Sequence, residues 1–152
     1  MSYVGNDNVL FSNHQQKNKD MAKQDYVARN REWLQQKAQE PGVKPLDRGI
    51  YYKVIRSGRP DGPRPRPSSV VTVHYTGRTI NGKQFDSSLG GPAQAMRMRD
   101  LIQGWIIALQ QMRPGDKWEV YLSAEMGYGR FSQPGIPGGS TLIFEIELTG
   151  VC

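Results

Sequence analysis

The chain changes character at Pro41-Gly42, and this break constrains the fold more than any other feature of the sequence. The stretch before it, residues 14–39, contains neither glycine nor proline and is rich in residues that favour helices. A narrow, mostly apolar stripe recurs there at the i, i+3, i+4, i+7 spacing of one helix face: Tyr26, Val27, Asn30, Trp33, Leu34 and Ala38. We therefore predict an amphipathic helix that ends at the break.

The apolar stripe of this helix admits two interpretations. Either it packs on the domain that follows or on a second copy of itself, forming a homodimer, or the helix is a loosely held spacer. Residues 1–12 show no periodicity, and we expect them to form a disordered terminus. The predicted organisation is thus a disordered terminus at 1–12, a helix and linker at 13–48, and one folded domain at 49–152.

The segment 49–152 has the pattern of an α+β domain. A helix is predicted at 101–112, and strands are predicted at 50–55, 70–79, from 83 onward, 117–122 and 141–148. The last strand alternates most clearly, because four large apolar residues share one face: Leu142, Phe144, Ile146 and Leu148. We expect about five antiparallel strands that cover one central helix, preceded by the N-terminal helical extension.

Two connections between the predicted strands carry strong turn signals. The stretch 57–68 contains six glycines and prolines and is predicted to be a loop. Asn81-Gly82, between the second and third predicted strands, is typical of a type I′ hairpin turn, in which both central residues need a positive φ.

The chain is basic, with 20 Lys and Arg against 14 Asp and Glu and a net charge of +6. Its local concentration of arginines, between Arg56 and Arg66, is interrupted by Asp61 and by prolines and does not alternate with aromatic residues. A single-strand-binding surface would need that alternation, so we expect a solvated basic surface and no nucleic-acid partner. No apolar run approaches the ~20 residues of a membrane helix, and we expect no membrane association.

The first eleven residues lack the basic start, the apolar stretch and the cleavage site of a signal peptide. We therefore expect a cytoplasmic protein, with a periplasmic location as the alternative if a leader has been removed. The single cysteine, Cys152, excludes an internal disulfide, and His14 and His74 are the only histidines. With so few ligands we expect neither a metal site nor a cofactor.

Motifs of nucleophilic, metal-dependent or phosphate-binding enzymes are missing from the sequence. His74 lies in a predicted strand without a nearby serine, so a structural role is expected. Aromatic residues fall at predicted strand ends, in loops and on the helix: Tyr75, Phe85, Trp105, Tyr128, Phe131 and Phe144. Each alone is typical of a core, but together they suit a pocket for an apolar ligand such as a prolyl ring.

Five segments resemble, in order and spacing, those of one known family: residues 73–77 (VHYTG), 82–88 (GKQFDSS), 101–105 (LIQGW), 127–129 (GYG) and 140–148 (STLIFEIEL). The family is that of the FKBP-type peptidyl-prolyl cis–trans isomerases, the macrolide-binding immunophilins, and the resemblance covers residues 49–152. Residues 42–55 also resemble the bacterial macrophage-infectivity-potentiator branch, in which a helical region precedes the isomerase domain and often dimerises. The resemblance implies a folding catalyst that acts on proline-containing polypeptides and is inhibited by macrolides of the rapamycin type.

The resemblance also assigns a pocket residue by residue. It implies that the catalytic residues are Tyr75, Phe85, Asp86, Tyr128 and Phe144. It implies that the substrate-binding residues are Met96, Leu101, Ile102, Trp105 and Ile136. In this assignment the tryptophan forms the floor, the pair before Gly104 offers backbone contacts, and the last isoleucine lies over the site.

Two departures from the family pattern leave a second function open. Met96 stands where the family commonly has phenylalanine, which keeps the pocket apolar but softer. Gly138-Gly139 stands where relatives often have proline and a polar residue. The alternative function is therefore a proline-binding or chaperone module that uses the same pocket without significant catalysis.

Overall fold

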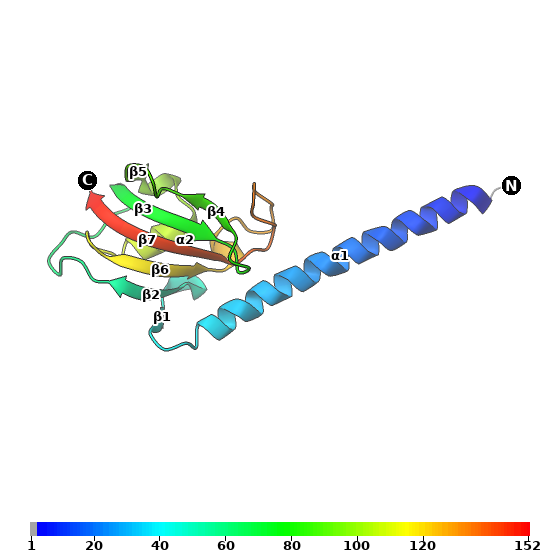
Figure 1. The fold of residues 1–152 in the computed structure, drawn as a ribbon, viewed down its shortest axis with the longest axis horizontal. Helices are drawn as coiled ribbons and strands as arrows, with labels where there is room; N and C mark the ends of the chain where they lie inside the picture. The colour runs from blue at the N-terminus through cyan, green and yellow to red at the C-terminus, as the bar shows by residue number, and fades with distance from the viewer. Residues whose placement is uncertain (1–2) are drawn as a thin grey trace.

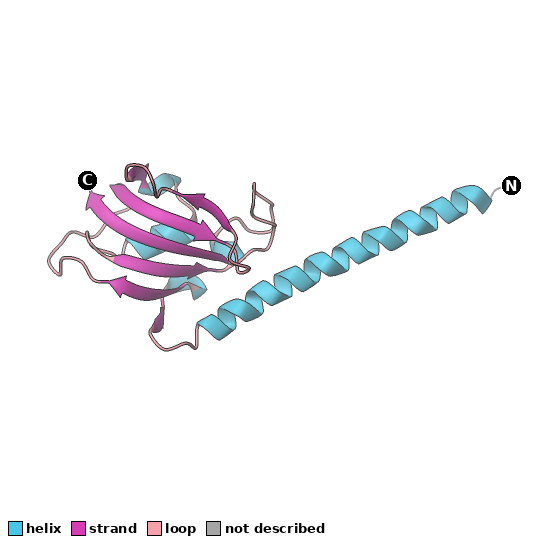
Figure 2. Cartoon of the chain, viewed as in Figure 1, coloured by secondary structure: helices cyan, strands magenta, loops and turns pink. Residues whose placement is uncertain are grey.

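The computed structural model describes residues 3–152, with side chains described from residue 13 onward. Its longer elements are, in chain order, α1 Tyr3–Lys37, β1 Val43–Pro45, β2 Tyr51–Arg56, β3 Val70–Arg78, β4 Gln84–Ser87, β5 Gln94–Arg97, α2 Gln103–Leu109, β6 Lys117–Leu122 and β7 Leu142–Val151. Single 3-10 turns lie at Asp47–Gly49, Met98–Asp100 and Ala124–Met126. The α+β class is confirmed, with helices and strands arranged as in Figure 2.

The strands form one antiparallel sheet in the order β1-β2-β6-β7-β3-β4, and β5 also pairs with β3 (Figure 1). β2 and β3 follow each other in the chain, yet β6 and β7 lie between them. The proline-rich connection 57–68 must therefore cross from one side of the sheet to the other. No strand is assigned within it, as its glycines and prolines predict.

The core lies between α2 and one face of the sheet, and α2 is behind the sheet in Figure 1. The alternation along β7 is confirmed, because its four inward residues are at most 3% exposed: Leu142, Phe144, Ile146 and Leu148. Trp105 and Leu109 of α2 pack in the same cluster. Gly104 allows the close approach of α2 to β6, since a Cβ there would lie 2.4 Å from a methyl carbon of Leu122.

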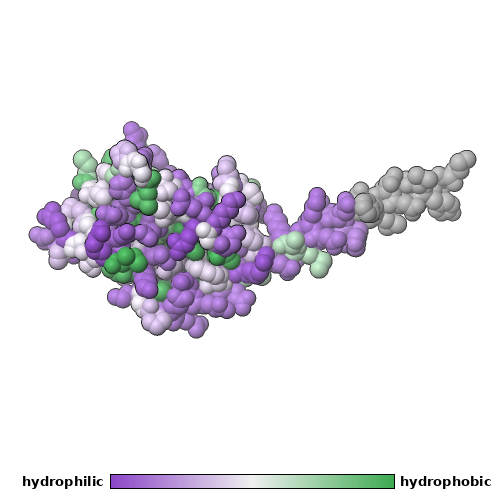
Figure 3. Space-filling model, viewed as in Figure 1, coloured by the Kyte–Doolittle hydropathy of each residue, from purple (hydrophilic) through white to green (hydrophobic). Residues whose placement is uncertain are grey.

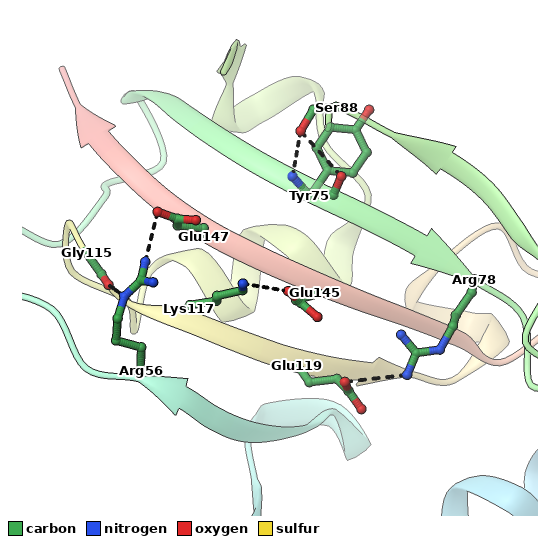
Figure 4. Close-up of polar contacts among 9 residues, drawn as sticks. All are labelled: Arg56, Tyr75, Arg78, Ser88, Gly115, Lys117, Glu119, Glu145 and Glu147. Carbon is green, nitrogen blue, oxygen red and sulfur yellow. Dashed lines mark hydrogen bonds and ion pairs between the residues drawn. The ribbon is translucent and has the colours of Figure 1, made fainter. Parts of the chain in front are cut away.

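The opposite face of the sheet carries cross-strand ion pairs along its centre (Figure 4). They are Arg56–Glu147 at 2.9 Å, Lys117–Glu145 at 2.9 Å and Arg78–Glu119 at 3.5 Å. These side chains are partly exposed, so each pair contributes only about 0–1 kcal/mol to stability. The pairs keep this part of the sheet polar where no helix covers it.

The C-terminal half of α1 covers one end of that outer face. Leu34 is buried together with Tyr121 and Ile143, and the Trp33 ring centre lies 5.9 Å from that of Tyr121. This contact explains why Ile143 is buried although it lies on the face of β7 opposite to α2. The prediction that the apolar stripe packs on the following domain is confirmed, whereas dimerisation through α1 stays a prediction.

The other half of α1 extends away from the domain as a rod (Figure 1). All side chains from 13 to 25 are exposed, and Figure 3 shows this part of the surface as mostly hydrophilic. Of the terminus predicted to be disordered, residues 1 and 2 lie outside the described residues. Residues 3–12 continue the helix instead, because a helix that has formed adds further residues at little cost and no proline interrupts it here.

Three local predictions differ from the structure. Within residues 3–152 the sheet has seven strands where about five are expected from the pattern, because β1 and β5 are short and do not alternate. The central helix is confined to Gln103–Leu109, within the predicted 101–112. The turn before β4 is not type I′, because Asn81 lacks a positive φ while Gly82 has φ +85°. Instead Gly82 N–H donates to Thr79 O at 3.0 Å, and a single glycine supplies the left-handed residue.

Candidate functional site

A pocket of about 250 Å³ opens above the N-terminal end of α2, between that helix, β3, β4 and the connection from β6 to β7. Nine of the ten predicted site residues line it: Tyr75, Phe85, Asp86, Met96, Leu101, Ile102, Trp105, Tyr128 and Phe144. They come from six separate stretches of the chain, and the fold brings them to one place. The residues picked out by the sequence therefore form one cavity.

Aromatic rings in edge-to-face contact form the floor and walls of the pocket. Trp105 contacts Tyr75 and Phe144, with ring centres 5.1 and 5.2 Å apart and planes at 83° and 87°. Phe85 meets Phe144 in the same way at 5.6 Å and 89°. Such pairs contribute about 0.5–1.5 kcal/mol each beyond the area that they bury, and they fix the ring planes relative to one another. The pocket is thus a rigid apolar box.

One hydrogen-bonded pair gives the wall of the box a polar edge. The Tyr75 hydroxyl donates to Asp86 Oδ2 at 2.8 Å, and the Ser87 backbone N–H donates to Asp86 Oδ1 at 2.8 Å. The register of β3 and β4, with Gly77 opposite Asp86, places the two partners side by side. Ser88 Oγ accepts the Tyr75 backbone N–H at 2.8 Å (Figure 4), which holds the base of the tyrosine.

Burial, with further contributions from the hydrogen bond and the charge of Asp86, raises the pKa of Tyr75 to about 12. Burial also raises the pKa of Tyr128, again with a contribution from Asp86. Both phenols are consequently protonated at neutral pH. Each hydroxyl can donate one hydrogen bond, and the hydroxyl of Tyr75 already does so to the carboxylate.

The raised pKa of Tyr75 predicts a loss of stability in strong base. Because the folded state holds this proton more tightly than the unfolded chain, the stabilisation is complete below pH 10 and disappears as the pH rises from 10.0 to about 12. We expect the free energy of unfolding, measured by urea titration at each pH, to fall less steeply in Tyr75→Phe than in the wild type over this interval. Equal slopes would contradict the assignment.

Two residues at the pocket differ from the prediction. Ile136 does not line the pocket. It is 4% exposed, packs in the main core cluster, and lines a different surface cavity together with Thr79 and Lys83. Asp100 lines the pocket and is exposed, but the sequence reasoning missed it. Its position directly before Leu101 and Ile102 was the available signal.

The profile of the FKBP-type peptidyl-prolyl cis-trans isomerases matches residues 62–149. The chain belongs to this family. Among curated relatives, FkpA of Escherichia coli is 37% identical over 128 residues, which cover 84% of this chain and 47% of FkpA. The outer membrane protein MIP of Legionella longbeachae is 43% identical over 115 residues, covering 74% of this chain and 48% of the relative.

Solved structures of the family have the same fold. The isomerase of Pseudomonas syringae pv. tomato superposes with a TM-score of 0.78 at 34% identity, covering 84% of this chain and 94% of that one. The structure of FkpA from Escherichia coli gives 0.81 at 35% identity, covering 90% of this chain and 63% of that one. The chain spans about half the length of the curated relatives that it matches.

The expectation of a cytoplasmic protein is not supported by these relatives, one of which is named an outer membrane protein. Such a name is consistent with the periplasmic alternative. Within residues 3–152, neither helix combines the length and the apolar character that crossing a bilayer requires.

Proposed function

We propose that this chain catalyses the cis–trans isomerisation of X–Pro bonds in unfolded or flexible polypeptides and so acts as a folding catalyst. FKBP-family isomerases act on proline-containing polypeptides. The observation that carries the proposal is the aromatic box of about 250 Å³, which has the size and apolar lining for a prolyl ring. The Tyr75–Asp86 pair at its edge supplies a fixed polar contact.

The reaction requires rotation about an amide bond and no bond cleavage. Amide resonance gives a barrier of about 18–20 kcal/mol, so the spontaneous exchange takes roughly tens to hundreds of seconds. In the twisted transition state the prolyl nitrogen loses its resonance with the carbonyl group. A dry pocket that holds the ring favours this less polar state over the planar amide. A thousandfold acceleration needs only about 4 kcal/mol of differential stabilisation.

Each lining residue has a part in this scheme. Trp105, Phe85 and Phe144 hold the ring and exclude water. Tyr128, whose hydroxyl is protonated at neutral pH, donates to a carbonyl oxygen of the bound peptide and so positions the peptide in the pocket. Asp86 fixes Tyr75 and adds a negative charge beside the twisting bond. Met96, Leu101 and Ile102 complete the apolar wall against which the flanking residues lie.

Removing the carboxylate of Asp86 should reduce catalysis without unfolding the domain. We expect Asp86→Ala to lower kcat/KM about two- to ten-fold, because the hydrogen bond that orients Tyr75 contributes about 0.5–1.5 kcal/mol. The measurement is a protease-free isomerisation assay with Ala-Leu-Pro-Phe. Asp61→Ala is the control, because this aspartate is 84% exposed in the loop between β2 and β3. Full activity in Asp86→Ala would remove Asp86 from the mechanism.

The pocket lining contains two carboxylates, Asp86 and Asp100, and no lysine or arginine. We therefore expect peptides with lysine beside the proline to be preferred over their glutamate counterparts. Asp100→Asn should reduce this preference by about two- to five-fold, the effect of one exposed ion pair, and salt should weaken it further. Comparing kcat/KM for both peptides in 50 and 500 mM NaCl tests this. An unchanged ratio in the variant would contradict the role of Asp100.

Three further properties belong to the same proposal. They are the binding of macrolides of the rapamycin type, a homodimer formed through the exposed half of α1, and a compartment outside the cytoplasm. The family supports the macrolides, the resemblance of residues 42–55 to a branch that often dimerises supports the homodimer, and the name of the Legionella relative supports the compartment. Sedimentation equilibrium of the wild type and of a chain that begins at residue 26 tests the dimer. Two monomeric proteins would reject it.

The second candidate function is a proline-binding module without significant catalysis, favoured by Met96 in the pocket wall. The two functions differ in one assay. A catalyst accelerates exchange of Ala-Leu-Pro-Phe at substoichiometric protein and loses this in Tyr128→Ala. A binding module shows saturable binding of the same peptide and no acceleration, which would refute our proposal.

A further inference from the structure

The connection from β6 to β7, residues 123–141, touches both the pocket and helix α1. We call it the Tyr128 loop. Tyr128 lines the pocket, while the next residue, Gly129, lines a second cavity of about 330 Å³ between the loop and α1. The helix side of that cavity is formed by Val27, Arg31 and Leu34. One short piece of chain therefore separates the N-terminal helix from the proposed active site.

The end of the Tyr128 loop is bonded to the polar residue of the apolar stripe. The Thr141 backbone N–H donates to Asn30 Oδ1 at 2.8 Å, and the Thr141 hydroxyl donates to the Asn30 backbone carbonyl at 3.1 Å. Asn30 is 1% exposed, and its amide N–H donates to the Tyr26 carbonyl at 2.8 Å. Burying an asparagine side chain costs free energy unless its polar atoms form hydrogen bonds. Here those hydrogen bonds fix the position at which the loop ends.

A second contact lies one residue earlier. The Ser140 hydroxyl donates its one hydrogen to the Pro137 carbonyl at 2.6 Å. In the contact between Tyr26 and Ser140, also at 2.6 Å, the Tyr26 hydroxyl must therefore be the donor and Ser140 Oγ the acceptor. Gly139 has φ +83°, and a Cβ on it would lie 2.5 Å from Val27 Cγ2. Helix and loop are therefore in direct contact, which no larger residue at 139 would allow.

These contacts continue through the loop to the pocket. The Gly139 N–H donates to the Gly129 carbonyl at 2.9 Å, and the Gly129 N–H donates to the Ala124 carbonyl at 2.7 Å. Gly129 is thus held from both sides of the loop, directly beside Tyr128. A shift of the segment that α1 holds would be transmitted by these bonds to the tyrosine.

We propose that Tyr26 and Asn30 are positioning residues for catalysis: they hold the Tyr128 loop so that the tyrosine stays at the pocket wall. The inference rests on the proposed function. It differs from simple docking of α1, because Trp33 and Leu34 already pack the helix against Tyr121 of the sheet. The polar contacts to the loop add a link between the helix and the site.

Kinetics of three single variants test this link. Tyr26→Phe removes one hydroxyl, Asn30→Ala removes the side-chain oxygen that accepts the Thr141 N–H, and Trp33→Phe alters the packing on the sheet. We expect kcat/KM for Ala-Leu-Pro-Phe to fall about two- to ten-fold in the first two variants and to remain at the wild-type value in the third. Near-ultraviolet circular dichroism checks that each variant is folded. If Asn30→Ala does not fold, the kinetics of Tyr26→Phe alone test the link.

A double-mutant cycle separates positioning from a general loss of structure. In the Tyr128→Phe background, Tyr26→Phe should cause no further loss of kcat/KM, because both act through the same hydroxyl. Additive losses, or wild-type activity in both folded helix variants, would overturn the inference. A second readout is independent of activity: the amide resonances of Tyr128 and Gly129 should shift in Tyr26→Phe and not in Trp33→Phe. An inactive wild type would refute the proposed function, while unchanged resonances would refute the positioning role.

Discussion

Phe144→Ala is expected to lower both the stability of the domain and the rate of X–Pro isomerisation. The side chain is 3% exposed, and its removal should reduce the free energy of unfolding by about 3–5 kcal/mol through lost burial and a new cavity. It also removes the edge-to-face contacts of Phe144 with Phe85 and Trp105. Because each contributes about 0.5–1.5 kcal/mol, we expect kcat/KM to fall about ten- to a hundredfold. Urea unfolding and the peptide assay measure the two effects.

A matched control for Phe144→Ala exists on the same strand. Leu148 lies on the same face of β7 and is fully buried, but it does not line the pocket. Leu148→Ala should cost about 2–5 kcal/mol of stability and leave kcat/KM of the folded protein unchanged. If both variants lost activity in proportion to stability, the phenylalanine would have no role beyond the core.

Gly77→Ala is expected to disturb the pocket although it adds only one methyl group. A Cβ at this position on β3 would lie 2.7 Å from Phe144 Cε1 and 2.7 Å from Phe85 Cζ. Both rings would have to move to make room, which would disturb the contact between them and the contact of Phe144 with Trp105. We expect a loss of about 1–3 kcal/mol in stability and of about tenfold in kcat/KM, which corresponds to ~1.4 kcal/mol.

Gly150 provides the comparison for Gly77. It lies on β7, and a Cβ there would meet nothing closer than 3.8 Å, at Thr72. Gly150→Ala should therefore leave stability within about 0.5 kcal/mol and leave kcat/KM unchanged. A Gly77→Ala protein with wild-type kinetics would show that the rings can move without consequence, contrary to the rigid box described above.

The central strands could be predicted because their burial repeats with the period of a strand. β7 has four buried residues at alternate positions, and β6 has the predicted bounds. β5 could not be predicted, because Gln94–Arg97 has a single apolar side chain larger than alanine and becomes a strand only by pairing with β3. β1 is three residues long and includes Pro45, so it too depends on its partner strand.

The part of the site that could be predicted from the sequence consists of residues that lie in the family motifs. Tyr75, Asp86 and Trp105 stand in segments with a family pattern, and all three line the pocket. Ile136 does not, because the path of the loop that carries it is set by long-range packing and not by the local sequence. The partner of Asn30 also lies beyond sequence reasoning, since the bond joins residues 111 positions apart.

Exchange spectroscopy by NMR on Ala-Leu-Pro-Phe with a catalytic amount of this protein tests the central claim most directly. The uncatalysed peptide exchanges over roughly tens to hundreds of seconds and gives no cis–trans cross-peaks at mixing times below one second. We predict such cross-peaks with the wild type and weaker ones with Asp86→Ala and Phe144→Ala. Shifted peptide resonances without exchange cross-peaks, from a folded wild-type protein, would show binding without catalysis and contradict the account.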